Sequence, residues 1–227
     1  MQKTTGYARL LAIWLLAFVT AALVFLLFPQ VDIAFSQLFY AEGFAAAKDP
    51  LLKLLRTIYL DSVWALGLLS IGGALWFWWK RRFALARACG YVATGMLLGP
   101  GLLTNGILKA YWGRARPDAV AEFGGDKIFS PPLLMSDQCA SNCSFVSGEG
   151  SGIFAAFFLL TGVFWGKLGP KARVLWVSVG GLIAIYGSGL RVAFGRHFFS
   201  DTLFAALFMA LIAIVLHRVF RLGSASE

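Results

Sequence analysis

The sequence predicts an all-α, polytopic membrane protein: a bundle of six transmembrane helices with an interfacial helix after the first span. Apolar residues make up 59% of the 227 residues and charged residues only 14%, whereas a soluble domain has roughly 25% charged residues. The apolar residues gather in six runs, most of them close to the length of about 20 residues that crosses a bilayer. The net charge of +9 falls in short clusters between these runs, as in membrane proteins. Nucleic-acid binders carry such charge along one face or tail, so no nucleic-acid partner is expected.

Each expected span is defined by one apolar run, in the order 10–28, 60–79, 83–108, 145–165, 174–190 and 202–216. The first run follows Lys3 and Arg9, as in a secretory signal peptide. It is longer than the apolar core of a signal peptide and lacks a small-residue cleavage pattern, so we interpret it as a retained helix. The sixth run is short, and its helix can begin several residues earlier. We expect residues 1–222 to form a single domain with its core at about 60–217, followed by a disordered tail at 223–227.

The basic residues predict the orientation of the bundle. If six spans alternate in direction, the N-terminus, the turns at 80–87 and 167–173, and the basic C-terminal end all fall on one side. Positive residues favour the cytoplasm, so both termini are expected inside. The opposite, outer side receives residues 29–59, 109–144 and 191–201.

Residues 29–50 are too polar to form a span. Apolar residues recur at helical spacing between Val31 and Phe39, with Asp32 and Gln37 among them. This pattern suits a helix that lies in the outer interface, and it equally suits a loop helix packed on the bundle.

Three polar clusters stand out on the outer side, where charges next to membrane spans are costly and need a reason. The first extends from Lys109 to Pro117 and contains Arg114 and Arg116. Lysine and arginine can hold a phosphate, arginine as a planar fork. Snorkelling cations among lipid headgroups would give the same pattern.

The second cluster is the small-residue segment 144–152 at the expected start of the fourth span. Exposed backbone N–H groups at a helix N-terminus bind anions, and Ser147 and Gly148 suit such a site. Glu149 places a carboxylate at the same position. By itself, the segment is also explained as an ordinary helix start whose acidic residue complements the helix dipole.

The third cluster contains Arg191, His197 and Asp201, with His197 four residues before Asp201. This spacing places both side chains on one helical face or across a helix start. An aspartate that binds one imidazole nitrogen leaves the other basic, so the histidine can act as a nucleophile or base. Such pairs also occur in purely structural roles. We interpret the other histidine, His217, as a structural residue at a helix end.

The joint pattern is more specific than its parts. The residues that form it are Lys109 and Arg116-Pro117, then Ser147-Gly148, then Arg191, His197 and Asp201. Their order and spacing resemble the motifs Lys-x6-Arg-Pro, Pro-Ser-Gly-His and Ser-Arg-x5-His-x3-Asp of the type-2 phosphatidic acid phosphatase superfamily of membrane lipid phosphatases. The resemblance covers residues 60–217 and includes the layout of six spans.

Three positions depart from the family motifs. Val146 replaces the proline, Leu190 replaces the serine before Arg191, and Glu149 replaces the histidine of the second motif. The resemblance assigns to that histidine the protonation of the leaving oxygen. A glutamic acid can take this role where burial keeps it protonated. We expect Glu149 to do so, because every other charged position of the motifs is present.

The resemblance implies one mechanism. The phosphate is bound by Lys109, Arg116, Arg191 and the backbone at Ser147 and Gly148. His197, oriented by Asp201, attacks phosphorus while Glu149 protonates the departing lipid oxygen, and water then hydrolyses the phosphohistidine. Three cations take the place of metal ions, and the sequence has no His/Asp cluster suited to two metals. We therefore expect neither a metal nor a cofactor.

The cysteines bear on the compartment. Cys139 and Cys143 lie in the expected outer loop before the fourth span, and Cys89 lies within the third span. An oxidising compartment such as the periplasm permits a Cys139–Cys143 disulfide, which is geometrically possible across three intervening residues. Two free thiols, or a metal pair that lacks partners, are the alternatives.

We therefore expect a lipid phosphatase that removes a phosphate monoester or diphosphate headgroup at the periplasmic face of a bacterial inner membrane. The glutamate-variant motif and the cysteine-bearing loop are similar to bacterial lipid A phosphatases. Undecaprenyl diphosphate, phosphatidylglycerol phosphate and phosphatidic acid stay open as substrates, as does the oligomeric state. The alternatives are a phosphotransferase that passes the phosphoryl group to another lipid, and a non-catalytic protein that binds or transports lipid phosphates.

Overall fold

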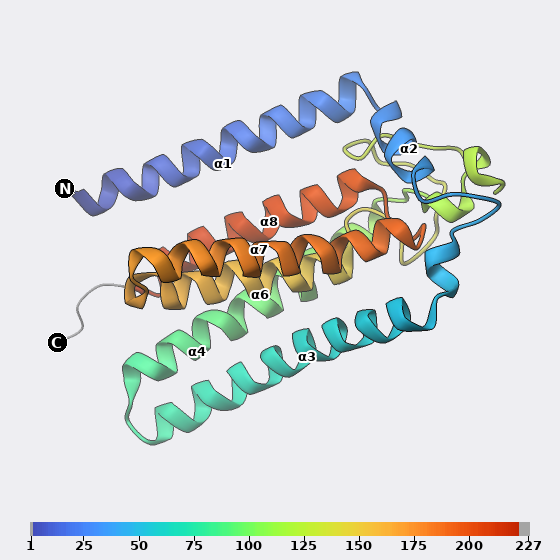
Figure 1. The fold of residues 1–227 in the computed structure, drawn as a ribbon. Helices are drawn as coiled ribbons and strands as arrows, with labels where there is room; N and C mark the ends of the chain where they lie inside the picture. The colour runs from blue at the N-terminus through green and yellow to red at the C-terminus, as the bar shows by residue number, and fades with distance from the viewer. Residues whose placement is uncertain (1, 223–227) are drawn as a thin grey trace.

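Six membrane-length helices form the bundle in the computed structural model, which describes residues 2–222, with side chains from residue 6 onward (Figure 1). They are α1 (Gln2–Leu27), α3 (Pro50–Trp79), α4 (Phe83–Met96) with its continuation to Tyr111, α6 (Gly148–Phe164), α7 (Pro170–Ala193) and α8 (Phe199–Val219). Within residues 2–222 there is no β-strand, only helices, turns and two isolated bridges. The all-α, six-span prediction is confirmed. The tail predicted at 223–227 lies outside the described residues.

Short helical segments lie in the connections between the spans. They are α2 (Gln30–Gln37), η1 (Ala45–Lys48), η3 (Pro117–Ala119), η4 (Ala121–Phe123) and η5 (Trp165–Lys167). Two further segments, η2 (Leu97–Leu108) and α5 (Lys109–Tyr111), continue the third span. Figure 1 shows that the start of α1 and the end of α8 lie at one end of the bundle, together with the α3–α4 turn. The connections that contain α2 and the loop before α6 gather at the opposite end, which we call the site end.

The second span begins at Pro50 and not at residue 60 as predicted. Asp49 caps the helix, because its side chain accepts a hydrogen bond from the Leu52 backbone N–H at 2.9 Å. Pro50 then occupies the first turn, where its missing N–H costs nothing. Lys53 and Arg56 lower the hydropathy of these first turns, so an apolar run alone places the start too late. This correction brings Arg56 onto a membrane-length helix.

The helix α6 lies at the centre of the bundle, where it contacts α3, α4, α7 and α8. Small residues allow this close packing. A Cβ atom added to Gly152 would lie only 2.7 Å from the Val63 side chain on α3. A buried apolar cluster around Leu159, Met209 and Tyr91 joins α4, α6 and α8 below the site end. The start of α6 is therefore held by neighbours on several sides.

The third span continues beyond α4 as a π-helical segment, η2, with Pro100 inside it. Proline cannot donate a backbone hydrogen bond, and wide π-helical turns in an α-helix are often found at functional sites. The Asn105 side chain donates to the Pro100 carbonyl oxygen at 2.7 Å. The segment ends at Leu108, directly before Lys109, at the site end of the bundle.

The helix α2 packs on the bundle through a polar face. Asp32 and Ser36 are its buried residues, and α2 contacts α1 and α8. This helix therefore packs against the bundle, as one of the two interpretations of residues 29–50 expects.

Candidate phosphate site

Most of the motif residues lie at the site end, around the start of α6 and the turn between α7 and α8. Lys109 begins α5, Arg191 stands in the last turn of α7, and Asp201 in the first turn of α8. Ser147 caps α6, because its hydroxyl accepts from the Gly150 backbone N–H at 3.1 Å. The sequence patterns far apart in the chain are thus brought to one end of the bundle.

His197 is almost completely buried, with 2% of its surface exposed. Its Nδ1 atom lies 2.8 Å from the backbone carbonyl oxygen of Ser144. A carbonyl oxygen only accepts, so Nδ1 carries the proton and Nε2 keeps its lone pair. Burial lowers the pKa of His197 to about 4, because the effect of burial outweighs the opposing effect of Asp201. At neutral pH the imidazole is uncharged, with Nε2 free to act as a nucleophile.

Asp201 and His197 are linked indirectly. Its Oδ2 atom lies 3.7 Å from His197 Nδ1, beyond hydrogen-bond distance. The same oxygen accepts from the Ser144 hydroxyl at 2.5 Å and from the Phe198 backbone N–H at 2.8 Å. Ser144 therefore links the two residues: its hydroxyl binds the carboxylate and its carbonyl binds the imidazole. The expected direct contact between Asp201 and His197 is replaced by this bridge, because Ser144 is the nearer acceptor.

Asp201 is also held by a buried network of ion pairs. Arg114 has no exposed surface, and it donates to Asp201 at 2.5 Å, to Asp32 at 2.8 Å and to the Ser130 carbonyl oxygen at 2.8 Å. Asp32 also accepts from the Ser200 backbone N–H and hydroxyl. Burial raises the pKa of Asp32, and Arg114 opposes that effect. Neither Arg114 nor Asp32 belongs to the joint motif pattern in the sequence.

The cations expected to bind phosphate differ in their surroundings. Arg191 is nine-tenths buried, yet its Nε atom has no hydrogen-bond acceptor in the described part of the chain. The nearest carboxylate oxygen, from Glu149, is 3.5 Å away. Arg116 donates to the Asn142 carbonyl oxygen at 2.6 Å. Burial lowers the pKa of Arg116, and the positive charge of Arg196 adds to this effect. A buried guanidinium nitrogen without an acceptor is suited to an anionic ligand.

Gly148 lets the start of α6 approach η2 closely. A Cβ atom at this position would lie 3.0 Å from Asn105 Oδ1 and 3.3 Å from Lys109 Nζ. The lysine ammonium thus lies against the first turn of α6, where free backbone N–H groups and the helix dipole also favour an anion. The Ser147 backbone N–H is not free, because it donates to the Asp201 carbonyl oxygen at 3.2 Å.

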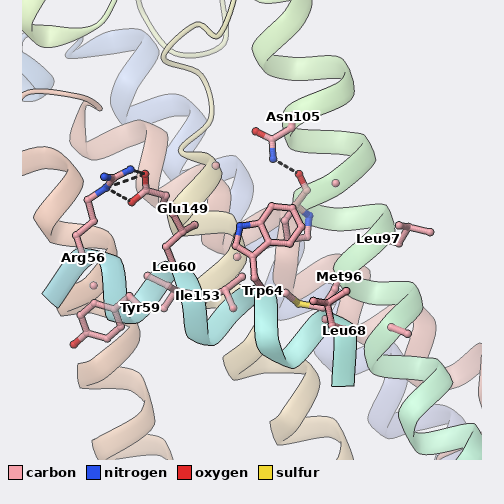
Figure 2. Close-up of a pocket in the computed structure, with 18 of the residues that line it drawn as sticks. Arg56, Tyr59, Leu60, Trp64, Leu68, Met96, Leu97, Asn105, Glu149 and Ile153 are labelled. Carbon is pink, nitrogen blue, oxygen red and sulfur yellow. Dashed lines mark hydrogen bonds and ion pairs between the residues drawn. The ribbon is translucent and has the colours of Figure 1, made fainter. Parts of the chain in front are cut away.

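Glu149 is bound by a residue outside every motif. The Arg56 guanidinium on α3 donates to it through Nε, at 2.9 and 3.2 Å, and through Nη2, at 2.6 Å. Figure 2 shows the two side chains facing each other from neighbouring helices. Two guanidinium groups, from Arg56 and Arg191, therefore stabilise the carboxylate form of Glu149. The only signal in the sequence was a charged residue just before an apolar run.

A cavity of about 450 Å³ opens beside this pair and extends along α3 and η2 into the apolar part of the bundle (Figure 2). At its polar end lie Arg56, Lys109, Gly148 and Glu149. The rest of its wall is mainly apolar and includes Leu60, Val63, Trp64, Leu68, Met96, Leu97 and Ile153. A polar end and an apolar body suit a molecule with an anionic headgroup and a hydrocarbon part.

The loop before α6 contains a disulfide between Cys139 and Cys143, and Cys89 is a free cysteine. Cys139 and Cys143 are therefore neither two free thiols nor a pair of metal ligands. Among the described residues, no three His, Cys, Asp or Glu side chains come together as a group that could hold a metal ion.

Comparison with known proteins identifies relatives over most of the chain. The family model described as PAP2 superfamily matches residues 84–223. The lipid A 4'-phosphatase of Francisella tularensis subsp. novicida is 35% identical over 88% of this chain and 90% of its own length. The lipid A 4'-phosphatase of Rhizobium etli is 33% identical over 93% and 89%. A transmembrane PAP2-type phosphatidylglycerolphosphate phosphatase from Bacillus subtilis has a similar fold, with a TM-score of 0.57 at 22% identity over 97% of this chain and 98% of that chain.

Proposed function

Because the chain belongs to the PAP2 superfamily, we propose that it removes the 4'-phosphate of lipid A at the periplasmic face of a bacterial inner membrane. Family and relatives together make the chain a membrane lipid phosphatase. Beyond this, we propose the identity of the lipid, the reaction intermediate and the side of the membrane. The choice of lipid A follows the names of the curated relatives.

The main observation in support of this reaction is the protonation state of His197. Its Nδ1 proton is held by the Ser144 carbonyl oxygen, which leaves the Nε2 lone pair for phosphorus. The same loop and helix starts bring Arg191, with its unmatched Nε, to this end of the bundle. A neutral nucleophile among cations suits attack on a phosphate, because the cations offset the charge that would repel it.

The proposed reaction has two steps. His197 Nε2 forms a bond to phosphorus, and the bond from phosphorus to the lipid oxygen breaks, while Glu149 in its acid form gives that oxygen a proton. Water then attacks the phosphohistidine, the bond from phosphorus to nitrogen breaks, and the Glu149 carboxylate takes the proton of the water. Inorganic phosphate leaves, and both residues return to their starting states.

Glu149 must become protonated before the first step. In the free protein its carboxylate is held by Arg56 and approached by Arg191. A bound phosphate competes with Glu149 for Arg191, and its negative charge favours the protonated form of a neighbouring carboxyl group. Substrate binding therefore prepares the acid.

The cavity supports a lipid substrate. Its apolar wall lies between membrane-length helices, and its polar end meets the Glu149 and Lys109 side chains. We propose that hydrocarbon of the lipid lies along this wall while the phosphate enters the polar end. The periplasmic side is supported by the basic turns at the opposite end of the bundle and by the disulfide, which is typical of an oxidising compartment.

The test is phosphate release by the purified protein in detergent, with lipid A, phosphatidylglycerol phosphate and phosphatidic acid compared side by side. We expect lipid A to give the highest kcat/KM, with mass spectrometry showing loss of a single phosphate, at the 4' position. His197→Ala should remove nearly all turnover and keep the elution profile of the folded protein. Preference for another lipid would overturn the substrate, and an active His197→Ala variant would overturn the nucleophile.

A further inference from the structure

We propose that Arg56 is a positioning residue of the active site, and that it acts only through Glu149. The chain has a glutamate where its family motif has a histidine, and Arg56 is the residue that makes this glutamate compatible with a phosphate. The inference rests on the proposed function, since it concerns the same site. It assigns a role to a helix, α3, that carries none of the family motifs.

The geometry of the pair is that of a bidentate salt bridge. Nε and Nη2 of Arg56 both point at the Glu149 carboxylate, at 2.9 and 2.6 Å to its two oxygens. Such fork-shaped pairs are directional as well as strong. The residues are 93 positions apart in the sequence and meet because α3 lies close to α6 at Gly152. A chance surface contact between long side chains would not need this close approach.

Charge explains why the pair is needed. A phosphate monoester carries about −1.5 to −2 near neutral pH, so an unpaired carboxylate at the start of α6 would repel it. Glu149 would also compete with phosphate for Arg191, whose Nε lies 3.5 Å from Oε2. Arg56 occupies both carboxylate oxygens and cancels the charge. With Arg56 in place, Arg191 and Lys109 stay available to the substrate.

The pair also lies at the place where a substrate enters. Arg56 and Glu149 both line the polar end of the cavity, next to Lys109 and Gly148. The Arg56 side chain is 36% exposed and that of Glu149 19%, so the pair is accessible from the cavity. Partly exposed ion pairs contribute little to stability. A role in holding α3 against α6 therefore explains the pair less well than a role at the site.

The experiment uses p-nitrophenyl phosphate, because its leaving group needs little help from an acid and Glu149 can be neutralised without removing all activity. Arg56→Ala is expected to lower kcat/KM by about 10²-fold, mostly through KM, a loss typical of misplaced site groups. Adding Glu149→Gln to Arg56→Ala should restore kcat/KM to the level of Glu149→Gln alone, because no carboxylate is left to neutralise. Arg56→Lys, which keeps the charge but not the fork, should recover part of the activity.

Lys53→Ala is the matched control, since Lys53 is an exposed cation one turn earlier on α3 and its side chain makes no ion pair with residues 6–222. It should leave kcat/KM unchanged. The proposal is overturned if Arg56→Ala is fully active, or if the double variant is as impaired as Arg56→Ala or more so. The latter result would mean that Arg56 binds substrate directly or only stabilises the fold. Because the readout is an aryl phosphate, a wrong lipid assignment would leave this test intact, whereas an inactive wild-type protein would contradict the proposed function itself.

Discussion

His197 and Ser144 are joined by a hydrogen bond of 2.8 Å between the imidazole Nδ1 and a backbone carbonyl oxygen. A backbone acceptor cannot be protonated in the physiological range, so the tautomer it selects is the same at every working pH. Asp201 contributes through the Ser144 hydroxyl and holds that segment in place. The tautomer of the proposed nucleophile is thus set by loop geometry as much as by a side-chain partner.

The first prediction concerns pH. Because burial lowers the pKa of His197 to about 4, the proposed nucleophile stays neutral well below the usual histidine range. The acidic limb of the kcat/KM profile of the free enzyme is expected near pH 4, measured with an aryl phosphate. A limb at about pH 6.5, the value of an unperturbed histidine, would contradict the buried, neutral state.

The same shift predicts how stability depends on pH. The unfolded chain takes up a proton on this histidine below about pH 6.5, whereas the folded protein does so only near 4. Protonation therefore favours the unfolded state between these values, and stability should fall as pH decreases through this window. In thermal scans in detergent, the Tm of the His197→Asn variant should fall less than that of the wild type as the pH is lowered from 6.5 to 4.

The second prediction concerns the buried network. Asp32→Ala would leave Arg114 with one carboxylate and the Ser200 backbone N–H without its acceptor. Breaking a buried pair costs about 3–5 kcal/mol, so a Tm decrease of roughly 10 °C is expected for a chain of this size. Asp118→Ala is the control, because Asp118 pairs with Arg196 at the surface, where a pair contributes about 0–1 kcal/mol. Equal effects of the two substitutions would show that the buried network is not a stabilising element.

The third prediction separates proton donation from phosphate positioning by Glu149. Glu149→Gln keeps the size of the side chain but cannot give a proton to the leaving oxygen. A lipid alkoxide is a poor leaving group, so the loss on lipid A should be about 10²–10⁴-fold, with a much smaller loss on p-nitrophenyl phosphate. An equal loss on both substrates would mean that Glu149 only positions the phosphate, and no loss on either would leave it as a helix-start charge.

The fourth prediction concerns topology. Single cysteines at Asp126, in the loop before α6, and at Gly166, in the turn between α6 and α7, are introduced into a Cys89→Ser background that retains the disulfide. An impermeant thiol reagent added to spheroplasts should label position 126 only, because the basic turn at Gly166 is expected in the cytoplasm. Labelling of position 166 alone would indicate the opposite orientation and contradict a periplasmic site.

Local patterns in the sequence are sufficient for the spans and the motif residues. Hydropathy over a helix length is a local property, and the six apolar runs predict all six membrane-length helices. The spacing between His197 and Asp201 is also local, and so is the Ser-Gly start of α6. Where polar residues interrupt a helix, as at Lys53 and Arg56, the same criterion misplaces its start.

The partners of the charged residues are a matter of tertiary structure. Arg56 and Glu149 come from helices far apart in the chain, as do Arg114 and Asp32, and no spacing rule connects them. A buried charge binds whichever opposite charge the packing brings within reach, and that depends on how closely α3, α6 and α2 approach one another. Ser144 serves His197 through its backbone carbonyl, a group that every residue has, so its identity in the sequence carries no sign of the role. The sequence by itself therefore determined the membrane fold and the motif residues proposed to react, whereas only the tertiary structure decided which groups hold and neutralise them.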